Sequence, residues 1–468
     1  MQTECSSEQL SFQAFGGRRV EGRFDAGRTT TDAGWLVVRE IEAKRGWLER
    51  FAECFVDHRE ASRVEHAISV LVKQRILGIV AGYEDVNDHE TLRDDALLAL
   101  ACGQEDLVGE RRPRERDRGH ALAGKSTLNR LEHAVVEEQL SRYRRVALDP
   151  AAIEGQFVDC MIEAHDEVPE RIVLDLDATD DPVHGHQEGR FFHGYYRSYC
   201  YLPLYIFCGD HLLCAKLRPA NQDGAAGSVE EVARIVDQIR SHWPEVEIWI
   251  RADSGFAREA LMAWCETNGV HYVLGLAKNA RLNRAIGEAL EAVRREQEAT
   301  GMAARLYREL RYRTKKTWSR ERRVVAKAEQ LPGKTNPRFV VTSLEAGAFP
   351  AQVLYETIYC ARGDMENRIK EQQLDLFADR TSTATMAANQ LRLWFASMAY
   401  VFVAELRRRG LQGTSLANAQ AGTIRTRLLK IAGLVKISAR RVYVSLSSVH
   451  PLQHVFAQAI HQLQAAPA

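Results

Sequence analysis

The sequence predicts an α/β protein whose mixed sheet is covered by helices on both faces. The first strand is expected in RIVLDLDAT, residues 171–179, where the spacing of apolar residues changes from helical to alternating. YCYLPLYIF and HLLCAKLRP are two more strands, and the Gly209-Asp210 turn between them indicates a hairpin. VEIWIRAD and HYVLGLA then alternate with amphipathic helical segments. Three sequential antiparallel strands followed by helix-linked strands are typical of a ribonuclease-H-like domain.

The elements on either side of this sheet are predicted to be mostly helical. Residues 1–30 have glycine-punctuated runs typical of short strands and turns. Helical spacing of apolar residues extends from Thr31 to about Ala164, interrupted at 104–119 by a charge-dense loop. Ser126 or Thr127 can cap the next helix. Three strands are expected in LYRELRYRT, RRVVAKAE and PRFVVTSL, followed by helices at about 362–376 and 386–406.

The chain has no net charge, but two of its segments are strongly basic. Lys+Arg and Asp+Glu both number 63. Residues 305–327 contain ten basic residues and two acids, and residues 401–468 contain nine and one, so each segment nets +8. Such segregation favours a polyanionic partner, and two solvated basic surfaces are the alternative.

Composition excludes several classes of protein. The hydrophobic fraction is 45%, which is ordinary for a globular protein and excludes a disordered chain. No run approaches 18 uncharged apolar residues, so no transmembrane helix is predicted. The nine cysteines are scattered, and reduced thiols in a cytosol are the simplest interpretation.

Three carboxylates occur where a sheet of this kind could hold metal ions. Asp177 lies on the first strand, Asp253 ends the fourth, and Glu366 lies on a later helix. Because the first and fourth strands are neighbours in this arrangement, we expect the three side chains to converge at one edge of the sheet. Oxygen ligands there could hold two Mg²⁺ ions roughly 3.5–4 Å apart and support phosphodiester cleavage.

Two of these positions leave alternatives open. Asp253, followed by Ser254 and Gly255, could instead form a turn or cap a helix. Asp175 shares a face with Asp177, so either could be the metal ligand; we favour Asp177.

Glu366 has its own alternative. Arg362 and Lys370 lie four residues to either side of it, as in a surface ladder of salt bridges. In the functional interpretation the same cations flank a metal ligand and hold phosphates, with Tyr359 on the same side.

Eight segments of the chain together resemble one family. They are LDLDATDDPVHGHQEG, YLPLYIF, RADSGF, YVLGLAKN, NPRFVVTSL, RGDMENRIKE, DLFADRTS and NQLRLWFASMAY. In this combination the chain resembles the DDE transposases of bacterial insertion sequences, specifically the family numbered thirteen-eighty, related to the IS-four-like group. The resemblance covers nearly the whole chain and is strongest from Arg171 to Tyr400.

The resemblance implies a DNA transposase that cuts transposon ends and joins them to target DNA by metal-dependent hydrolysis and transesterification. Asp177, Asp253 and Glu366 would be its catalytic and metal-binding residues, with two Mg²⁺ ions that Mn²⁺ can replace. Its partners would be double-stranded DNA, namely terminal inverted repeats and target, and a second subunit in a DNA-bound homodimer. The resemblance also implies a cytoplasmic bacterial protein, associated with the nucleoid when bound to DNA, with no membrane partner.

A tyrosine, arginine, glutamate and lysine signature of the family falls on Tyr359, Arg362 and Glu366. In the broader superfamily the lysine lies seven residues past the glutamate, where this chain has Gln373. Lys370, one helical turn from Glu366, is the nearest substitute.

We expect three regions: a mostly helical N-terminal DNA-binding region over 1–168, a ribonuclease-H-like catalytic domain over 169–410, and a basic C-terminal region over 411–468. The catalytic domain should carry a β-rich insertion at about 301–344. Within that insertion, Trp318 could hold an unpaired base while neighbouring cations hold phosphates. A hairpin-tip or core tryptophan is the alternative.

The N-terminal region should contain the reader of the terminal repeats. A helix starting at Ser126 could bring Thr127, Asn129 and Arg130 near base edges or phosphates, or pack in a scaffold. In all, the predicted DNA contacts are Tyr359, Arg362, Lys370, Trp318, Lys315, Lys316, Arg320, Arg322, Arg323, Asn129 and Arg130.

Two other functions compete with this one. A ribonuclease-H-like nuclease without strand transfer would need neither the large N-terminal region nor the basic insertion. An inactivated transposase that only binds DNA would not need Asp177, Asp253 and Glu366 intact.

Overall fold

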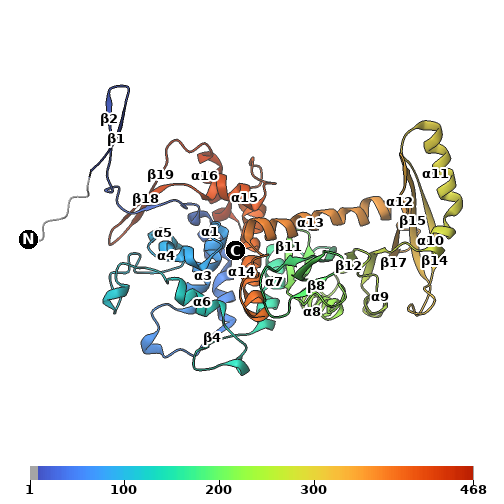
Figure 1. Ribbon diagram of the computed structural model, residues 1–468, viewed down its shortest axis with the longest axis horizontal. Helices are drawn as coiled ribbons and strands as arrows, with labels where there is room; N and C mark the ends of the chain where they lie inside the picture. Colours follow the sequence, from blue (N-terminus) through green and yellow to red (C-terminus); the bar gives the residue numbers. More distant parts are fainter. Residues whose placement is uncertain (1–8, 467–468) are drawn as a thin grey trace, which may run out of the picture. The chain divides into compact units, whose positions relative to one another are not determined.

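The computed structural model describes residues 9–466, and the chain forms two compact units. Unit 1 combines Met1–Leu148 with Phe402–Ala468, and unit 2 is Asp149–Val401. The chain passes from unit 2 back to unit 1 within helix α14, Met386–Glu405 (Figure 1).

Unit 2 is built on a nine-stranded mixed sheet. Its order is β11-β10-β6-β12-β13-β17-β15-β14, with β16 paired to β15. The strands are β6 (Arg171–Ala178), β10 (Leu204–Cys208), β11 (His211–Lys216), β12 (Glu247–Ala252), β13 (His271–Leu276), β14 (Ala304–Tyr312), β15 (Arg322–Leu331), β16 (Lys334–Thr335) and β17 (Arg338–Thr342). β12 is parallel to both β6 and β13, whereas all other pairs are antiparallel. The predicted order of strands is thus confirmed, including the β10–β11 hairpin.

Alternation along the strands gives the sheet two apolar faces. On β6, Ile172, Leu174 and Leu176 are buried in one core cluster with apolar residues of α8 (Ser228–His242) and α9 (Glu259–Thr267). The opposite face buries Trp249 and Val273 against Leu354 and Tyr355 of a later helical stretch. Helices therefore cover both faces, as the sequence predicts. α7 (Pro150–Ala164) also belongs to unit 2, although its residues precede position 169.

The predicted β-rich insertion extends this sheet and does not form a separate one. β17 pairs with β13, and β15 and β14 follow outward from it. α10 (Ala280–Ala285) precedes α11 (Gly287–Thr300), which packs along β14 and β15 (Figure 1). A further small sheet, in the order β7-β9-β8, follows Asp177; its strands are β7 (Asp181–Pro182), β8 (Phe191–His193) and β9 (Ser198–Tyr201).

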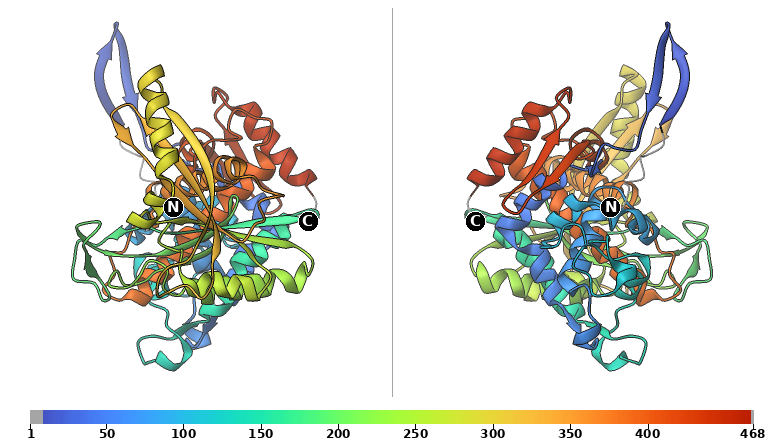
Figure 2. Two further views of the ribbon diagram at one scale, coloured as in Figure 1. Left: turned by 90° about the vertical axis from the view of Figure 1, so that its right-hand side faces the viewer. Right: turned by 90° about the vertical axis from the view of Figure 1, so that its left-hand side faces the viewer.

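Unit 1 is mainly helical. Its helices are α1 (Trp35–Arg45), α2 (Trp47–Glu53), α3 (Ile68–Val80), α4 (His89–Leu92), α5 (Ala96–Ala101), α6 (Lys125–Glu132), α15 (Ala421–Ile424) and α16 (Gln453–Ala465). Short strands complete it: the hairpin of β1 (Leu10–Phe15) and β2 (Arg18–Gly22) drawn in blue in Figure 2, the pair β4 (Phe55–Asp57) and β5 (Val146–Leu148), and the sheet of β3 (Thr29–Thr30), β18 (Gly433–Ile437) and β19 (Val442–Leu446). None of the described helices is long and apolar enough to cross a bilayer.

The C-terminal segment, expected as a region of its own, is part of unit 1. β18 pairs with β3, and Lys430 Nζ lies 2.6 Å from an oxygen of buried Asp32. Arg425 Nε donates to the carbonyl of Val80 at 3.1 Å. Several basic residues of this segment therefore hold the fold together, a role that sequence charge alone does not distinguish from DNA binding.

Candidate active site

Two of the predicted acids meet at one edge of the sheet. β6 and β12 run parallel with Leu176 opposite Ala252, so Asp177 and Asp253 occupy the next position of each strand. The expectation that the first and fourth strands are neighbours is confirmed. Because parallel strands end at the same edge, both carboxyl groups lie there, and both are partly shielded from solvent.

Glu366 lies on a helical stretch that covers the face of the sheet beside this edge. The stretch comprises α12 (Ala351–Val353), the π-helical η5 (Leu354–Tyr359), η6 (Cys360–Arg362), α13 (Gly363–Lys370) and the π-helical η7 (Glu371–Asp375). Figure 1 shows α12 and α13 in one continuous run. Met365 and Ile369 are buried while Glu366 and Lys370 are exposed, so burial follows helical spacing. Wide π-helical turns recur at functional sites, and here one of them presents Tyr359.

Arg251 fixes this helical stretch to the sheet. Its Nε and Nη2 donate to the two oxygens of Asp175 at 2.5 and 2.7 Å. Its Nη1 donates to the carbonyl of Ile358 at 2.6 Å, one residue before Tyr359. Asp175 is buried, so this bidentate pair occupies it fully. The pair leaves Asp177 as the acid of β6 that is open to a ligand.

Arg362 links two of the predicted acids. Its Nη2 donates to Glu366 Oε1 at 2.8 Å, and its Nη1 lies 3.7 Å from Asp177 Oδ2. Nη1 is buried and has no hydrogen-bond partner within residues 9–466. Of the ladder that the sequence suggested, the Arg362–Glu366 pair is present, and Arg362 also reaches the sheet edge.

The environment of Asp177 makes its carboxyl harder to ionise than an exposed aspartate. Burial raises the pKa of the Asp177 carboxyl to about 6, although Arg362 acts in the opposite direction. The negative charges of Asp253 and Glu366 add to the rise in this pKa. The three acids therefore interact electrostatically, as carboxylates that share a cation site would.

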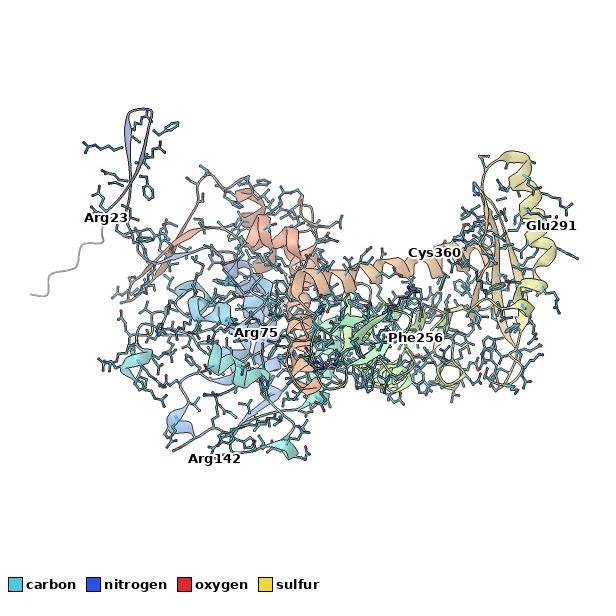
Figure 3. All side chains as sticks on the ribbon, in the orientation of Figure 1. Arg23, Arg75, Arg142, Phe256, Glu291 and Cys360 are labelled. Carbon is cyan, nitrogen blue, oxygen red and sulfur yellow. The ribbon has the colours of Figure 1, made fainter. Side chains whose placement is uncertain are left out.

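Asp253 forms the turn that the sequence offered as one interpretation of this residue. Its Oδ1 accepts the backbone N–H of Gly255 at 2.8 Å, which forms the expected turn. Phe256, labelled in Figure 3, follows this turn and is buried in the core. Its burial anchors the turn to the core. No described residue donates to Asp253 Oδ2 in this structure.

Tyr359 packs closely over the neighbouring strand. A Cβ atom on Gly275 of β13 would lie 2.6 Å from the Tyr359 hydroxyl oxygen and 2.9 Å from the backbone nitrogen of Ser254. Only glycine leaves room for this contact. Burial raises the pKa of Tyr359, Arg362 lowers it, and Asp253 raises it further, which places the hydroxyl in the field of the site. The importance of Gly275 could not be read from the segment YVLGLAKN alone.

Over residues 9–466, neither Gln373 nor Lys370 forms an ion pair at the position of the signature lysine. Gln373, at the position where the superfamily has lysine, donates from Nε2 to the carbonyl of Asp180 at 3.1 Å and so holds the loop after Asp177. Lys370 is exposed, and within the described residues it has no ion pair.

Two cations near this edge were given no role by the sequence analysis. Lys278 follows β13, and Arg338 begins β17, whose Phe339 pairs with Leu276 of β13. Both are exposed and without an ion pair in the described part of the chain. Arg338 also lowers the pKa of Tyr359. Strand pairing over sixty residues places them together, and no local pattern indicates it.

Three residues of the insertion that the sequence predicts to contact DNA are buried in this structure. Trp318 is 4% exposed and packs edge-on to Tyr312 at 5.7 Å, so it has no free face for a base. Arg322 pairs with Glu259 and Glu266 at 2.7 and 2.6 Å. Arg323 pairs with Glu309 and donates to two backbone carbonyls.

The other predicted cations of the insertion stay available for DNA. Lys315 and Lys316 are exposed, and Arg320 is exposed beside Glu266 at 3.4 Å. In unit 1, α6 buries Leu128 and Leu131, while Asn129 and Arg130 are exposed and Thr127 is half-buried. DNA contact by these residues remains a prediction.

The acids fit a divalent metal by chemistry. Within the described residues, no three His, Cys, Asp or Glu side chains form a ready-made metal cage. Asp177, Asp253 and Glu366 nevertheless supply oxygen ligands of the kind Mg²⁺ prefers, and the charges of the other two acids raise the pKa of Asp177. Arg362 now neutralises part of this charge.

Comparison with known proteins gives one match. The sequence model of a family described as transposase DDE domain group 1 matches residues 12–468. No curated protein matches the chain.

Proposed function

Because the chain belongs to the family described as transposase DDE domain group 1, we propose that it cuts transposon ends and joins them to target DNA. The observation that carries the proposal is the placement of Asp177 and Asp253 at adjacent ends of parallel strands, with Glu366 connected to Asp177 through Arg362. The reaction would be hydrolysis of the end phosphodiester followed by attack of the freed 3′-hydroxyl on target DNA.

The proposal also covers the type of catalytic core and the insertion-sequence family. The strand order β11-β10-β6-β12-β13, with only β12 and β13 parallel to β6, supports a ribonuclease-H-like catalytic core. We retain the relation to the insertion-sequence family numbered thirteen-eighty, and to the IS-four-like group, as part of this proposal.

Asp177, Asp253 and Glu366 would hold two Mg²⁺ ions, or Mn²⁺ in their place. Bound there, the metal supplies charge stabilisation at the phosphate oxygens. Arg362 would then turn from the acids to the DNA, since its buried Nη1 already lacks an acceptor among the described residues. Lys370 lies two helical turns further along and would contact a neighbouring phosphate. Arg251 and Gln373 would keep the helix and the Asp177 loop in place.

The substrate would be double-stranded DNA carrying the terminal inverted repeats, together with a target duplex. Both ends must be cut in one complex, so we expect a homodimer on DNA. The site of action would be the bacterial cytoplasm, at the nucleoid. Lys315, Lys316 and Arg320 of the insertion, with Tyr359 and Arg362, are proposed to contact the end DNA.

Cleavage of end-labelled DNA carrying the element's own termini tests this proposal. D253N and E366Q should lose cleavage in Mg²⁺, and EDTA should abolish it in the unchanged protein. D364N is a matched control, because Asp364 is an exposed acid on the same helix. Retained cleavage in D253N would overturn the site. Cleavage without joining would indicate a nuclease, and binding without cleavage an inactivated transposase.

A further inference from the structure

Unit 1 contains a cleft of about 550 Å³ that the catalytic site does not use. We call it the α6 cleft, since the start of α6 forms one wall; the other wall is the charge-dense loop around Arg114 and Arg116. Seven of its lining residues are Lys or Arg and three are Asp or Glu. Its volume is in the range of pockets that hold ligands, roughly 300–1,000 Å³.

The α6 wall is held rigidly. Glu132 at the end of α6 is buried and accepts from Arg75 Nε at 2.7 Å; Arg75 is labelled in Figure 3. At the other end, Glu90 Oε1 accepts the backbone N–H of Lys125 at 2.7 Å. A Cβ on Gly124 would lie 2.9 Å from the same oxygen, so the helix start fits closely against Glu90.

The loop wall is also built from specific contacts. Arg112 donates to the backbone carbonyls of Glu65 and His120 at 2.8 and 3.2 Å. Gly109 has φ +72°, and a Cβ there would lie 2.3 Å from the His120 oxygen. Arg112 therefore fixes the loop to the segments around Glu65 and His120, while Arg114 and Arg116 line the cleft.

Part of the positive charge in the cleft is not neutralised. Arg59 and Arg114 are paired, with Asp57 at 2.6 Å and Glu65 at 3.1 Å. Lys125 in the first turn of α6 and Arg130 in its last turn are both exposed and have no ion pair within residues 9–466. Arg93 pairs with Glu90 through Nη2 at 3.5 Å, but its Nε is shielded from solvent and has no hydrogen-bond partner in that range. These groups can accept an anionic ligand without breaking an existing pair.

The lining chemistry discriminates between kinds of ligand. His66 and His120 are the only aromatic side chains that line the cleft, and Leu122 is its only large apolar residue. The cleft therefore lacks the Phe, Tyr or Trp platform on which unpaired bases commonly stack. Arginine and lysine groups around a polar cleft instead match phosphate oxygens.

We propose that the α6 cleft binds consecutive phosphates of the backbone of double-stranded DNA, independently of base sequence. The cleft would position the DNA rather than read it, which assigns Arg130 to a phosphate and not to a base edge. The proposal rests on the proposed function only in requiring that the protein binds DNA.

Salt dependence of binding tests the proposal directly. Binding of the full-length protein to duplexes with and without the terminal repeat would be measured in EDTA across a salt series. Each phosphate contact contributes roughly 0.9 to the slope of log K against log salt concentration. K125A/R130A should therefore lower the slope by about 2, and the affinity at low salt by about tenfold or more, equally for both duplexes.

The control is R142A/R144A, which removes two exposed charges of unit 1 outside the cleft; Arg142 is labelled in Figure 3. It should leave the slope within error of the unchanged protein. An equal loss in this control would overturn the proposal, because net charge would then explain the effect. A loss confined to the repeat-bearing duplex would also overturn it, since the cleft would be reading bases.

A free nucleotide offers the same phosphate chemistry, so ATP is titrated as a separate arm. Saturable ATP binding that is lost in K125A/R130A, with DNA affinity unchanged, would overturn the DNA assignment. Absence of any DNA binding by the unchanged protein would instead contradict the proposed function. Binding with an unchanged slope in K125A/R130A would overturn only the cleft.

Discussion

The sheet edge of unit 2 and the α6 cleft of unit 1 have opposite chemistry for the same kind of partner. The edge gathers Asp177 and Asp253, with Glu366 from the covering helix, whereas the cleft is lined by seven cations and three acids. An acidic edge repels DNA until cations are bound, but a basic cleft attracts it directly. A net charge of zero therefore describes neither region. It also separates two measurable properties: metal should govern cutting and salt should govern binding.

The largest expected effect is on cutting. D253N should lower the rate of end cleavage by about 10³-fold or more, because a metal ligand supports several kcal/mol of transition-state stabilisation. Affinity for the same DNA in EDTA should change less than threefold, since the α6 cleft is untouched. Single-turnover cleavage and equilibrium binding on one duplex measure both. Loss of binding in parallel with cleavage would show that the two regions are not separable.

A second comparison lies within strand β6, where two acids two residues apart have different surroundings. Asp175 is locked to Arg251 by two hydrogen bonds, whereas Asp177 has a pKa raised to about 6 by burial and neighbouring acids. D175N leaves Arg251 without its partner and should destabilise unit 2 by about 3–5 kcal/mol. D177N removes a partly buried negative charge that lies near two other acids. The free energy of unfolding at pH 8 should therefore stay equal or rise.

Urea unfolding monitored by tryptophan fluorescence measures this difference. The R251M variant provides a check, because it breaks the same pair from the other side and should be destabilised as much as D175N. A stable D175N protein together with an unstable D177N protein would reverse the assignment of structural and catalytic acid.

The sequence was sufficient for the sheet edge because the signals there are local. Alternation in RIVLDLDAT and VEIWIRAD located both strands, and the position of each acid at a strand end followed directly. The choice between Asp175 and Asp177 needed Arg251, which lies on another strand and contacts both Asp175 and the Ile358 carbonyl.

Burial within the insertion could not be predicted in the same way. Arg322 and Arg323 look like surface cations in the run of ten, but each meets an acid that lies 14 to 63 residues away. Trp318 packs on Tyr312 across a turn. Because its neighbours in the sequence are basic, the local pattern predicts an exposed position although the side chain lies in the core. The α6 cleft could not be predicted either, because its residues come from three separate stretches of unit 1.

A smaller effect should follow from enlarging Gly275. A methyl group there would lie 2.6 Å from the Tyr359 hydroxyl and must displace that side chain. G275A should slow cleavage by up to about 10²-fold, as expected for a misplacement of about 1 Å near reacting atoms. Y359F in the G275A background tests the cause. If the hydroxyl is the obstacle, the double variant should cleave no more slowly than Y359F alone.

The smallest expected effect concerns stability and connects the acids to the metal. The pKa of Asp177 is raised to about 6 in the folded protein, so the folded state holds this proton more tightly than the unfolded state. Stability is therefore lost as pH rises from about 4 through 6, and the loss persists above 6. A divalent cation favours the ionised carboxyl and should recover that stability. Mg²⁺ should raise the melting temperature more at pH 8 than at pH 5.

Thermal melting at both pH values, with Mg²⁺ and with EDTA, measures the increment. In D177N the difference between the two pH values should shrink, because no titrating carboxyl remains at that position. Salt at matched ionic strength controls for screening. Equal increments at pH 5 and pH 8 in the unchanged protein would mean that Asp177 does not contact the metal. The acidic edge would then resemble the basic cleft in responding to salt alone, and the contrast between the two regions would be lost.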